Sequence, residues 1–371
     1  MESDISPSAS PAASRDRFAP VYRILTNAIA ARAFPGCAFG VLSGGKVVLQ
    51  DALGHFTYDE GAPAVSANTV YDVASITKVA ATTAGAMLLY QRGQLRLDTP
   101  LGDLLPGFVV GRASGQHAHL VTVRNLLAHN SGLPGYVGLF RTVNSPADLF
   151  RALLELPLEA APGKRAEYSD PGFMLLGKAL EVCMNEPLAT WVGREIHAPL
   201  GMTATRFCPQ LDARPSIPPT EEDTGWRRRR IQGEVQDEHA WLLNGVAGHA
   251  GLFSNVPDLL RFAAEILVAG STPAKHGLFD PSTVARFAER QSPEGSSRAL
   301  GWDTPSDNSS SGHHFSRHSI GHLGFSGCSL WIDLDAGIAA TLLTNRTWPD
   351  RQSQLIREIR PAFHNAVREA L

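Results

Sequence analysis

Residues 72–78 read Asp-Val-Ala-Ser-Ile-Thr-Lys, and they contain the pair Ser75-x-x-Lys78. A serine hydroxyl is a poor nucleophile at neutral pH until a neighbouring base takes its proton. The following residues, 79–90, are rich in helix formers and contain no proline. If a helix begins near Ser75, residues i and i+3 share one face, so the Lys78 amine can reach the Ser75 oxygen. The pattern is typical of a lysine-activated serine nucleophile. It is also compatible with an N-capping serine followed by a solvated lysine.

Three later motifs favour the first interpretation. In chain order they are Glu167-Tyr168-Ser-Asp170-Pro171, Gly245-Val-Ala-Gly-His249-Ala-Gly251 and Gly321-His322-Leu-Gly324-Phe325-Ser-Gly327. With Ser75-x-x-Lys78, their order and spacing resemble the serine beta-lactamase and penicillin-binding-protein superfamily. More narrowly, the chain is similar to class C beta-lactamase-like serine hydrolases, which include esterases, D-aminopeptidases and low-molecular-weight D,D-peptidases. The resemblance covers roughly residues 18–348.

Hydrophobic periodicity predicts an α+β fold. Apolar runs at 36–43 and 46–53 meet at Gly44-Gly45, which is a hairpin signal, and strands return at 327–334 and 337–344. Between them the pattern is mainly helical, at 74–92, 122–129, 146–155, 171–184 and 188–196. We therefore expect an antiparallel sheet built from N- and C-terminal segments and flanked by helices, with an inserted helical lobe. The resemblance implies this same beta-lactamase/transpeptidase-like architecture, with the active site between the lobes.

The expected domain organisation is a flexible tail at 1–15 and one catalytic domain at 16–371. Within it we expect a sheet lobe at about 16–73 and 245–371, a helical lobe at about 74–205 and an extended loop at about 206–244. The 371 residues suffice for a substantial core, and 43% hydrophobic and 19% charged residues indicate a globular protein.

Each candidate site residue has a functional and a structural interpretation. Tyr168 is a proton shuttle in the first and a packing residue in the second. Asp170 stands where the family usually has Asn; its carboxylate would hold Lys78 protonated, or it caps the helix that Pro171 opens. His322 occupies the place of a Lys in true beta-lactamases. We expect it to bind a substrate carboxylate as a group titrating near pH 6.5, or else simply to end a strand.

The resemblance further implies an oxyanion hole made by the backbone N–H groups of Phe325 and Ser75. Gly324 would let the backbone approach the substrate closely. His249 either lines the cleft floor or packs in a turn, and Arg124, His129 and Asn130 are expected to be structural.

No metal site and no cofactor are expected. His313, His314, His318 and His322 lie within ten residues, but their spacing fits no zinc signature. The four cysteines, at 37, 183, 208 and 328, have no C-x-x-C spacing and are expected to be reduced and buried. The Arg227–Arg230 run, opposite acids at 221–223, is expected to form a solvated or locally paired loop rather than a nucleic-acid patch, and the net charge of −3 gives no sign of a nucleic-acid partner.

A cytoplasmic location is expected, because no run of 18 apolar residues and no basic-then-apolar N-terminal signal is present. The predicted function is a serine hydrolase that cleaves a small ester, amide or D-amino-acid peptide through an acyl-Ser75 intermediate. The Lys-to-His replacement at 322 argues for weak or no beta-lactamase activity. The alternative is a penicillin-binding sensor that acylates without turnover, and a zinc hydrolase is a third class.

Overall fold

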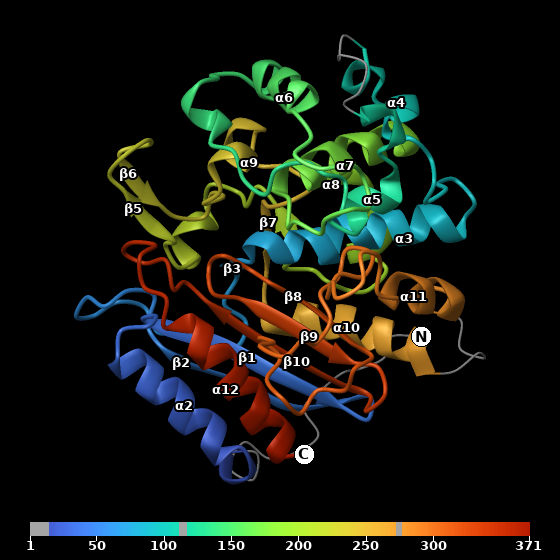
Figure 1. Ribbon diagram of the computed structural model, residues 1–371. Coiled ribbons are helices and arrows are strands. Elements are labelled where there is room, and N and C mark those ends of the chain that lie inside the picture. Colours follow the sequence, from blue (N-terminus) through green and yellow to red (C-terminus); the bar gives the residue numbers. More distant parts are fainter. Residues whose placement is uncertain (1–14, 111–116, 272–276) are drawn as a thin grey trace.

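The computed structural model describes residues 15–110, 117–271 and 277–371. Residues 1–14 of the predicted tail lie outside these ranges. The described residues form a mixed structure of helices and antiparallel sheet, which confirms the predicted fold class (Figure 1).

A five-stranded antiparallel sheet joins the two ends of the chain, in the order β2-β1-β10-β9-β8. The hairpin at Gly44-Gly45 is confirmed, and both glycines have positive φ values. The pairing of β1 with β10 brings residues some 300 positions apart into register, for example Cys37 opposite Thr344. The five strands are β1 (Gly36–Ser43), β2 (Lys46–Gly54), β8 (Ser319–Leu323), β9 (Ser329–Asp333) and β10 (Ile338–Thr344).

The two faces of this sheet bury different cores, because alternate side chains of a strand point to opposite faces. From β1, Phe39 and Val41 pack with the helices α2 (Ala19–Ala30) and α12 (Ile356–Glu369). Ala38 and Leu42 join the main core on the other face, where α10 (Val256–Ser271) covers β1 and β10 (Figure 1). The sheet is thus covered on both faces.

The helical part lies on the far side of α10 from the sheet, and its buried side chains continue the same hydrophobic core. Helix α6 has the bounds that the sequence predicts, 146–155. The remaining helices are α3 (Ala84–Gln91), α4 (Leu101–Leu104), α5 (Val123–Leu127), α6 (Pro146–Glu155), α7 (Asp170–Met184), α8 (Leu188–Val192), α9 (Glu238–Leu242) and α11 (Pro281–Ala288). The short strands are β3 (Tyr71–Asp72), β4 (Arg206–Phe207), β5 (Glu221–Asp223), β6 (Arg229–Ile231) and β7 (Leu252–Ser254).

Two stretches contain more regular structure than expected. Residues 206–244, expected as an extended loop, contain the hairpin β5–β6 and the helix α9, and 319–323, to which no strand was assigned, form the sheet strand β8. Both were missed because their strands are too short, or too rich in polar and small residues, to show an apolar alternation. The expected local pairing of the arginine run is confirmed, since Arg227 binds Asp223 and Arg230 binds Glu222 across this hairpin.

Candidate active site

Ser75 lies in a tight turn between the two parts of the molecule. The expected α-helix does not begin there. Ala74–Ile76 form one 3₁₀ turn, Lys78–Thr83 wind as a π-helix, and α3 follows. The backbone of Ala74 has φ = 47°, a left-handed conformation that is strained for a residue with a Cβ. Strained backbone of this kind persists only where the surrounding structure holds it in place, and it is often found at functional sites.

Two buried polar side chains hold this turn. Asp72 accepts hydrogen bonds from the backbone N–H of Ala74 at 2.9 Å and of Gln236 at 2.8 Å. Thr77 Oγ1 donates to the Ala74 carbonyl at 2.6 Å and accepts from Leu252 N at 3.0 Å. The Ser75 backbone is therefore fixed against β7 and against the segment that precedes α9.

Lys78 is fully buried, and its ammonium faces three acceptors. Measured from Nζ, they are Asp170 Oδ1 at 2.7 Å, Ser75 Oγ at 3.1 Å and the backbone carbonyl of His249 at 3.1 Å. An ammonium has three hydrogens and no acceptor lone pair, so these contacts use all its donors.

Burial lowers the pKa of Lys78, but the nearby charge of Asp170 and the contact with Tyr168 outweigh it, so the pKa is raised. Lys78 is thus a cation in this arrangement. This agrees with the alternative in which the Asp170 carboxylate holds Lys78 protonated, because the opposite charge outweighs the desolvation of the amine.

Asp170 is not the N-cap of α7. The cap is Ser169, whose Oγ accepts from Gly172 N at 3.0 Å and donates to the Pro134 carbonyl at 2.7 Å. Asp170 is the first helical residue, and its carboxylate, 20% exposed, turns to Lys78. Ser169 and Asp170 are both good N-cap residues, so the sequence left open which of them caps α7. The structure leaves Ser169 as the cap, because Asp170 pairs with the buried Lys78.

The Tyr168 ring packs beside Lys78, with Nζ 4.8 Å from the ring centroid. On its other sides lie the rings of His129 and His322, at centroid distances of 4.6 and 5.8 Å, and the guanidinium of Arg298 at 5.2 Å. Burial raises the pKa of Tyr168, and the charge of Lys78 opposes that rise only in part. Tyr168 is therefore a neutral phenol beside a cation.

His129 is structural, as expected: its Nδ1 accepts from Ser169 N at 3.0 Å and its ring stacks on Phe173.

His322 differs from the expected titratable cation. It is 3% exposed, and burial, followed by the charges of Lys78 and Arg298, lowers its pKa well below the ordinary value. Its Nδ1 lies 2.8 Å from the Leu323 carbonyl and must donate, because a carbonyl only accepts. The neutral ring then carries an unprotonated Nε2, which has no partner. His322 offers an acceptor at the site, and no charge for a carboxylate.

The end of β8 closes tightly against the serine turn. A Cβ at Gly324 would meet the Val73 carbonyl at 2.4 Å, so only glycine fits there. Ser326 Oγ donates to the Asp72 carbonyl at 2.7 Å, and Arg360 binds the carbonyls of Gly324 and Cys328. The side chain of Phe325, by contrast, is about half exposed.

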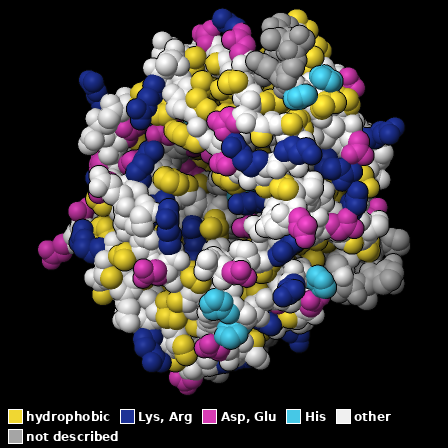
Figure 2. Space-filling model, in the orientation of Figure 1, with side chains coloured by type: hydrophobic (Ala, Val, Ile, Leu, Met, Phe, Trp, Pro, Cys, Tyr) yellow, Lys and Arg dark blue, Asp and Glu magenta, His cyan; other side chains and the backbone are white. Residues whose placement is uncertain are grey.

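These residues line one cavity of about 680 Å³, a usual size for a small-molecule site. Figure 2 shows the corresponding face hollowed near its centre, with Lys and Arg side chains beside the hollow. Five arginines line the cavity, and three of them bind protein acceptors closely: Arg346, Arg351 and Arg360. Arg298, which also lies beside the Tyr168 ring, has a loose contact of 3.7 Å with Asp303, and Arg357 is exposed. The cavity thus keeps positive charge for a ligand.

Comparison with known proteins agrees with this geometry. The beta-lactamase family model matches residues 21–361, nearly the whole chain. The chain belongs to the beta-lactamase family. An N-acetylmuramyl-L-alanine amidase of Bacillus subtilis is 30% identical over 352 residues, covering 85% of this chain and 78% of the amidase.

Two solved structures have the same fold as this chain. A penicillin-binding-protein homologue from Caulobacter crescentus has a TM-score of 0.75 at 18% identity, covering 96% of this chain and 98% of the homologue. EstCE1, a hydrolase with promiscuous acyltransferase activity, has a TM-score of 0.71 at 20% identity, covering 94% and 100%. The chain is a hydrolase of the beta-lactamase serine hydrolase superfamily.

The structure brings all seven candidate residues to one cavity: six line it, and Lys78 lies beneath Ser75. The sequence analysis missed Arg298, which lies in a Ser/Gly-rich run without periodicity. It also missed Asp237 and His239, which line or approach the same region. The Asp-Glu-His run ten residues before His249 was the available signal.

Two further expectations are tested by the described residues. All four cysteines are free, but only Cys37 and Cys328 are buried, whereas Cys208 is exposed. Within residues 15–110, 117–271 and 277–371, no helix has the length and apolarity needed to cross a membrane.

Proposed function

We propose that this protein cleaves an ester or amide bond through a covalent acyl-Ser75 intermediate. The observation that carries the proposal is the Ser75 hydroxyl, held 3.1 Å from a buried Lys78 ammonium at the edge of a ligand-sized cavity. A nucleophile paired with a proton-handling group, itself oriented by a third group, is the arrangement that acyl transfer needs. Asp170 is that third group here.

The proton of Ser75 passes to Asp170 through Lys78. As Ser75 attacks the carbonyl carbon, Lys78 gives one proton to Asp170 Oδ1, 2.7 Å away, and takes the serine proton in its place. Tyr168, a neutral phenol, then protonates the leaving amine or alcohol, and the Lys78 cation stabilises the resulting tyrosinate. In deacylation the tyrosinate takes a proton from water, and Lys78 returns the proton of Asp170 to Ser75 Oγ as it leaves the acyl group. Protons balance over the cycle.

The oxyanion is assigned to the backbone N–H groups of Ser75 and Phe325. The close packing of Gly324 against Val73 supports this assignment, since it brings the end of β8 to the serine turn. Two backbone donors fixed before the reaction are worth roughly 3–4 kcal/mol each in acyl transfer.

The preferred substrate carries a carboxylate and an amide or ester bond. Arg298, loosely paired beside Tyr168, is the group that binds the carboxylate. Because His322 is neutral, the cation of true beta-lactamases is missing at its position, which supports weak activity on beta-lactams. The similarity to the Bacillus subtilis amidase adds support for a peptide amide. The reaction uses no cofactor.

The test is turnover of p-nitrophenyl butyrate, a D-alanyl-D-alanine peptide and the same peptide with an amidated C-terminus. The proposal predicts product well beyond one equivalent, faster cleavage of the free-acid peptide than of its amide, and no activity in Ser75→Ala. A burst that stops at one equivalent for every substrate would replace the hydrolase by a sensor that acylates without turnover.

A further inference from the structure

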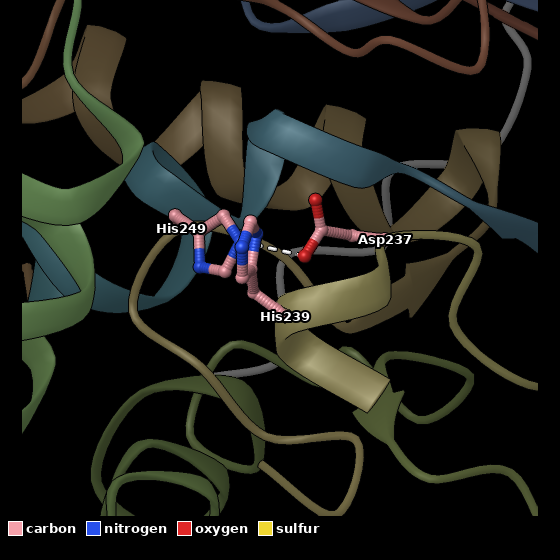
Figure 3. Close-up of side chains that lie close together, drawn as sticks. All are labelled: Asp237, His239 and His249. Atoms are coloured by element: carbon pink, nitrogen blue, oxygen red, sulfur yellow. Dashed lines mark hydrogen bonds and ion pairs between the residues drawn. The ribbon is translucent and has the colours of Figure 1, made fainter. Parts of the chain in front are cut away.

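Asp237, His239 and His249 form a second cluster of reactive side chains beside the serine site (Figure 3). Each offers one ligand atom, and these atoms all lie within 4.8 Å of one another. Asp237 directly precedes α9, His239 is in its first turn, and His249 lies before β7. Among the described residues this is the one His/Cys/Asp/Glu group that converges in this way. The four histidines at 313–322 do not.

The two imidazoles are buried without sufficient partners. His239 and His249 are each 1% exposed. Both ring nitrogens of His239 and Nδ1 of His249 have no hydrogen-bond partner. A buried polar atom left unpaired costs about 1–3 kcal/mol, so native structures normally give it a partner. Figure 3 shows the two rings close together, with the Asp237 carboxylate directed at them; the ring planes are inclined by 61°.

Aromatic neighbours and a backbone carbonyl fix the orientation of the His239 ring. Tyr136 and Phe140 pack edge-on against it, with centroid distances of 5.7 and 5.4 Å. The Val137 carbonyl lies near the ring, although its geometry falls short of a hydrogen bond. A metal-bound imidazole typically directs its other N–H at such a backbone carbonyl, which fixes the ring.

The Asp237 carboxylate already accepts two hydrogen bonds. Its Oδ1 accepts from His249 Nε2 at 2.8 Å and from Ala240 N at 2.8 Å. The proton between Asp237 and His249 occupies the place that a cation would take.

We propose that Asp237, His239 and His249 bind one zinc-type divalent cation. Two imidazoles and one carboxylate form the three-ligand set of open zinc sites, in which water or substrate takes the fourth position. Bond lengths of 2.0–2.1 Å place tetrahedral ligand atoms about 3.3 Å apart. The longer separations, up to 4.8 Å, therefore need to shorten, while the 2.8 Å contact of Asp237 with His249 opens slightly and releases its shared proton.

The site adjoins the serine site at two points. The His249 carbonyl accepts from Lys78 Nζ at 3.1 Å, and Asp237 lines the cavity that contains Ser75. Gln236, the residue before Asp237, also binds the Asp72 carboxylate that holds the serine turn. A bound cation therefore stabilises the 236–249 segment and adds positive charge to the cavity wall. The zinc site does not depend on the proposed serine chemistry.

The test uses full-length protein stripped with a chelator and titrated with zinc chloride and, separately, cobalt chloride. We expect one equivalent bound per chain, a cobalt absorption spectrum typical of four-coordination and a melting temperature that rises with added zinc. His239→Phe, which fits the aromatic surroundings, and Asp237→Asn should each weaken binding at least 100-fold. His318→Gln, which removes an exposed histidine elsewhere, should bind as the wild type does.

Two outcomes would overturn the site. One is no saturable binding by the wild-type protein. The other is equal binding by the wild type and a folded His239→Phe or Asp237→Asn protein, or a loss of binding in His318→Gln instead. Labelling of Ser75 by a fluorophosphonate, measured in the stripped protein, is expected to persist. It separates failure of the zinc site from failure of the serine mechanism.

Discussion

Removal of the Asp170 carboxylate leaves a fully buried ammonium without its counter-ion. In the structure Lys78 Nζ has 0% side-chain exposure and lies 2.7 Å from Asp170 Oδ1. Breaking one partner of a buried ion pair costs about 3–5 kcal/mol. The Asp170 side chain is 20% exposed, so water partly screens the charge and the lower end applies. We expect Asp170→Ala to lower the free energy of unfolding by about 3 kcal/mol.

The assay is urea unfolding at constant pH, with the midpoint and the slope m fitted for each variant. Asp170→Asn should lose less, about 1 kcal/mol, because it keeps an acceptor but not the charge. In a Lys78→Met background, the effect of Asp170→Ala should largely vanish, since no buried cation is left. Ser169→Ala is the matched control: it removes the true N-cap and should cost about 0.5–2 kcal/mol in both backgrounds.

The same pair controls the pH profile. In the wild type the proton acceptor is Asp170, so kcat should be nearly flat between pH 7 and 9. In Asp170→Asn only neutral Lys78 can take the serine proton, so kcat should rise with pH over that range. A loss of 1 kcal/mol or less in Asp170→Ala that is unchanged by Lys78→Met would refute the buried-pair reasoning. A wild-type profile that rises with pH would refute the role of Asp170.

Four further outcomes follow from the site and the core. Arg298→Gln should lower kcat/KM for a carboxylate-bearing substrate roughly 10- to 100-fold, because it loses a charged hydrogen bond of about 1.5–3 kcal/mol, and should leave kcat/KM for a neutral ester unchanged. Arg290→Gln, outside the cavity, is the control. Equal losses on both substrates would exclude carboxylate binding by Arg298. Wild-type KM for that anionic substrate should not change between pH 6 and 8, because His322 stays neutral; a rise would restore the titrating His322. Tyr168→Phe should lower kcat on the order of 10²-fold for amides, and an unchanged rate would remove Tyr168 from proton transfer. The free energy of unfolding should fall as the pH drops from 6.5 to 5, because histidines of the unfolded chain take up protons that the folded protein excludes. Each of four buried histidines contributes up to about 1.4 kcal/mol per pH unit. His364→Gln should make the free energy of unfolding less dependent on pH, and an unchanged dependence would contradict the His364 pKa of about 3. These four histidines, all with lowered pKa values and all outside the proposed zinc cluster, are His129, His197, His322 and His364.

The sheet could be predicted because its strands have clear local signals. The Gly44-Gly45 turn fixes one hairpin, and the apolar runs of β1 and β10 are long enough to be recognised as strands from the sequence. The strand β8 was missed because its five residues, Ser-Ile-Gly-His-Leu, alternate without a clear apolar pattern. A Cβ at Gly321 would clash with the Trp331 ring, so the glycine that weakens the strand signal is required by packing across the sheet.

The candidate residues could be predicted, but the charge state of His322 could not. Motif spacing located Ser75, Lys78, Tyr168 and His322, whereas their charges depend on what surrounds them. Lys78 is protonated because α7 brings Asp170 to it across 92 residues. His322 is neutral because β8 buries it and directs its Nδ1 to the backbone. The sequence placed an acid at 170 that would hold Lys78 protonated, whereas the burial that keeps His322 neutral is not visible in its local sequence.

The nucleophile is the central claim, and covalent labelling tests it most directly. The purified protein is treated with a fluorophosphonate, digested and analysed by mass spectrometry. The account predicts a single adduct on Ser75, strongly reduced labelling in Lys78→Ala and none in Ser75→Ala. An adduct on another serine, or undiminished labelling of Ser75→Ala, would contradict it.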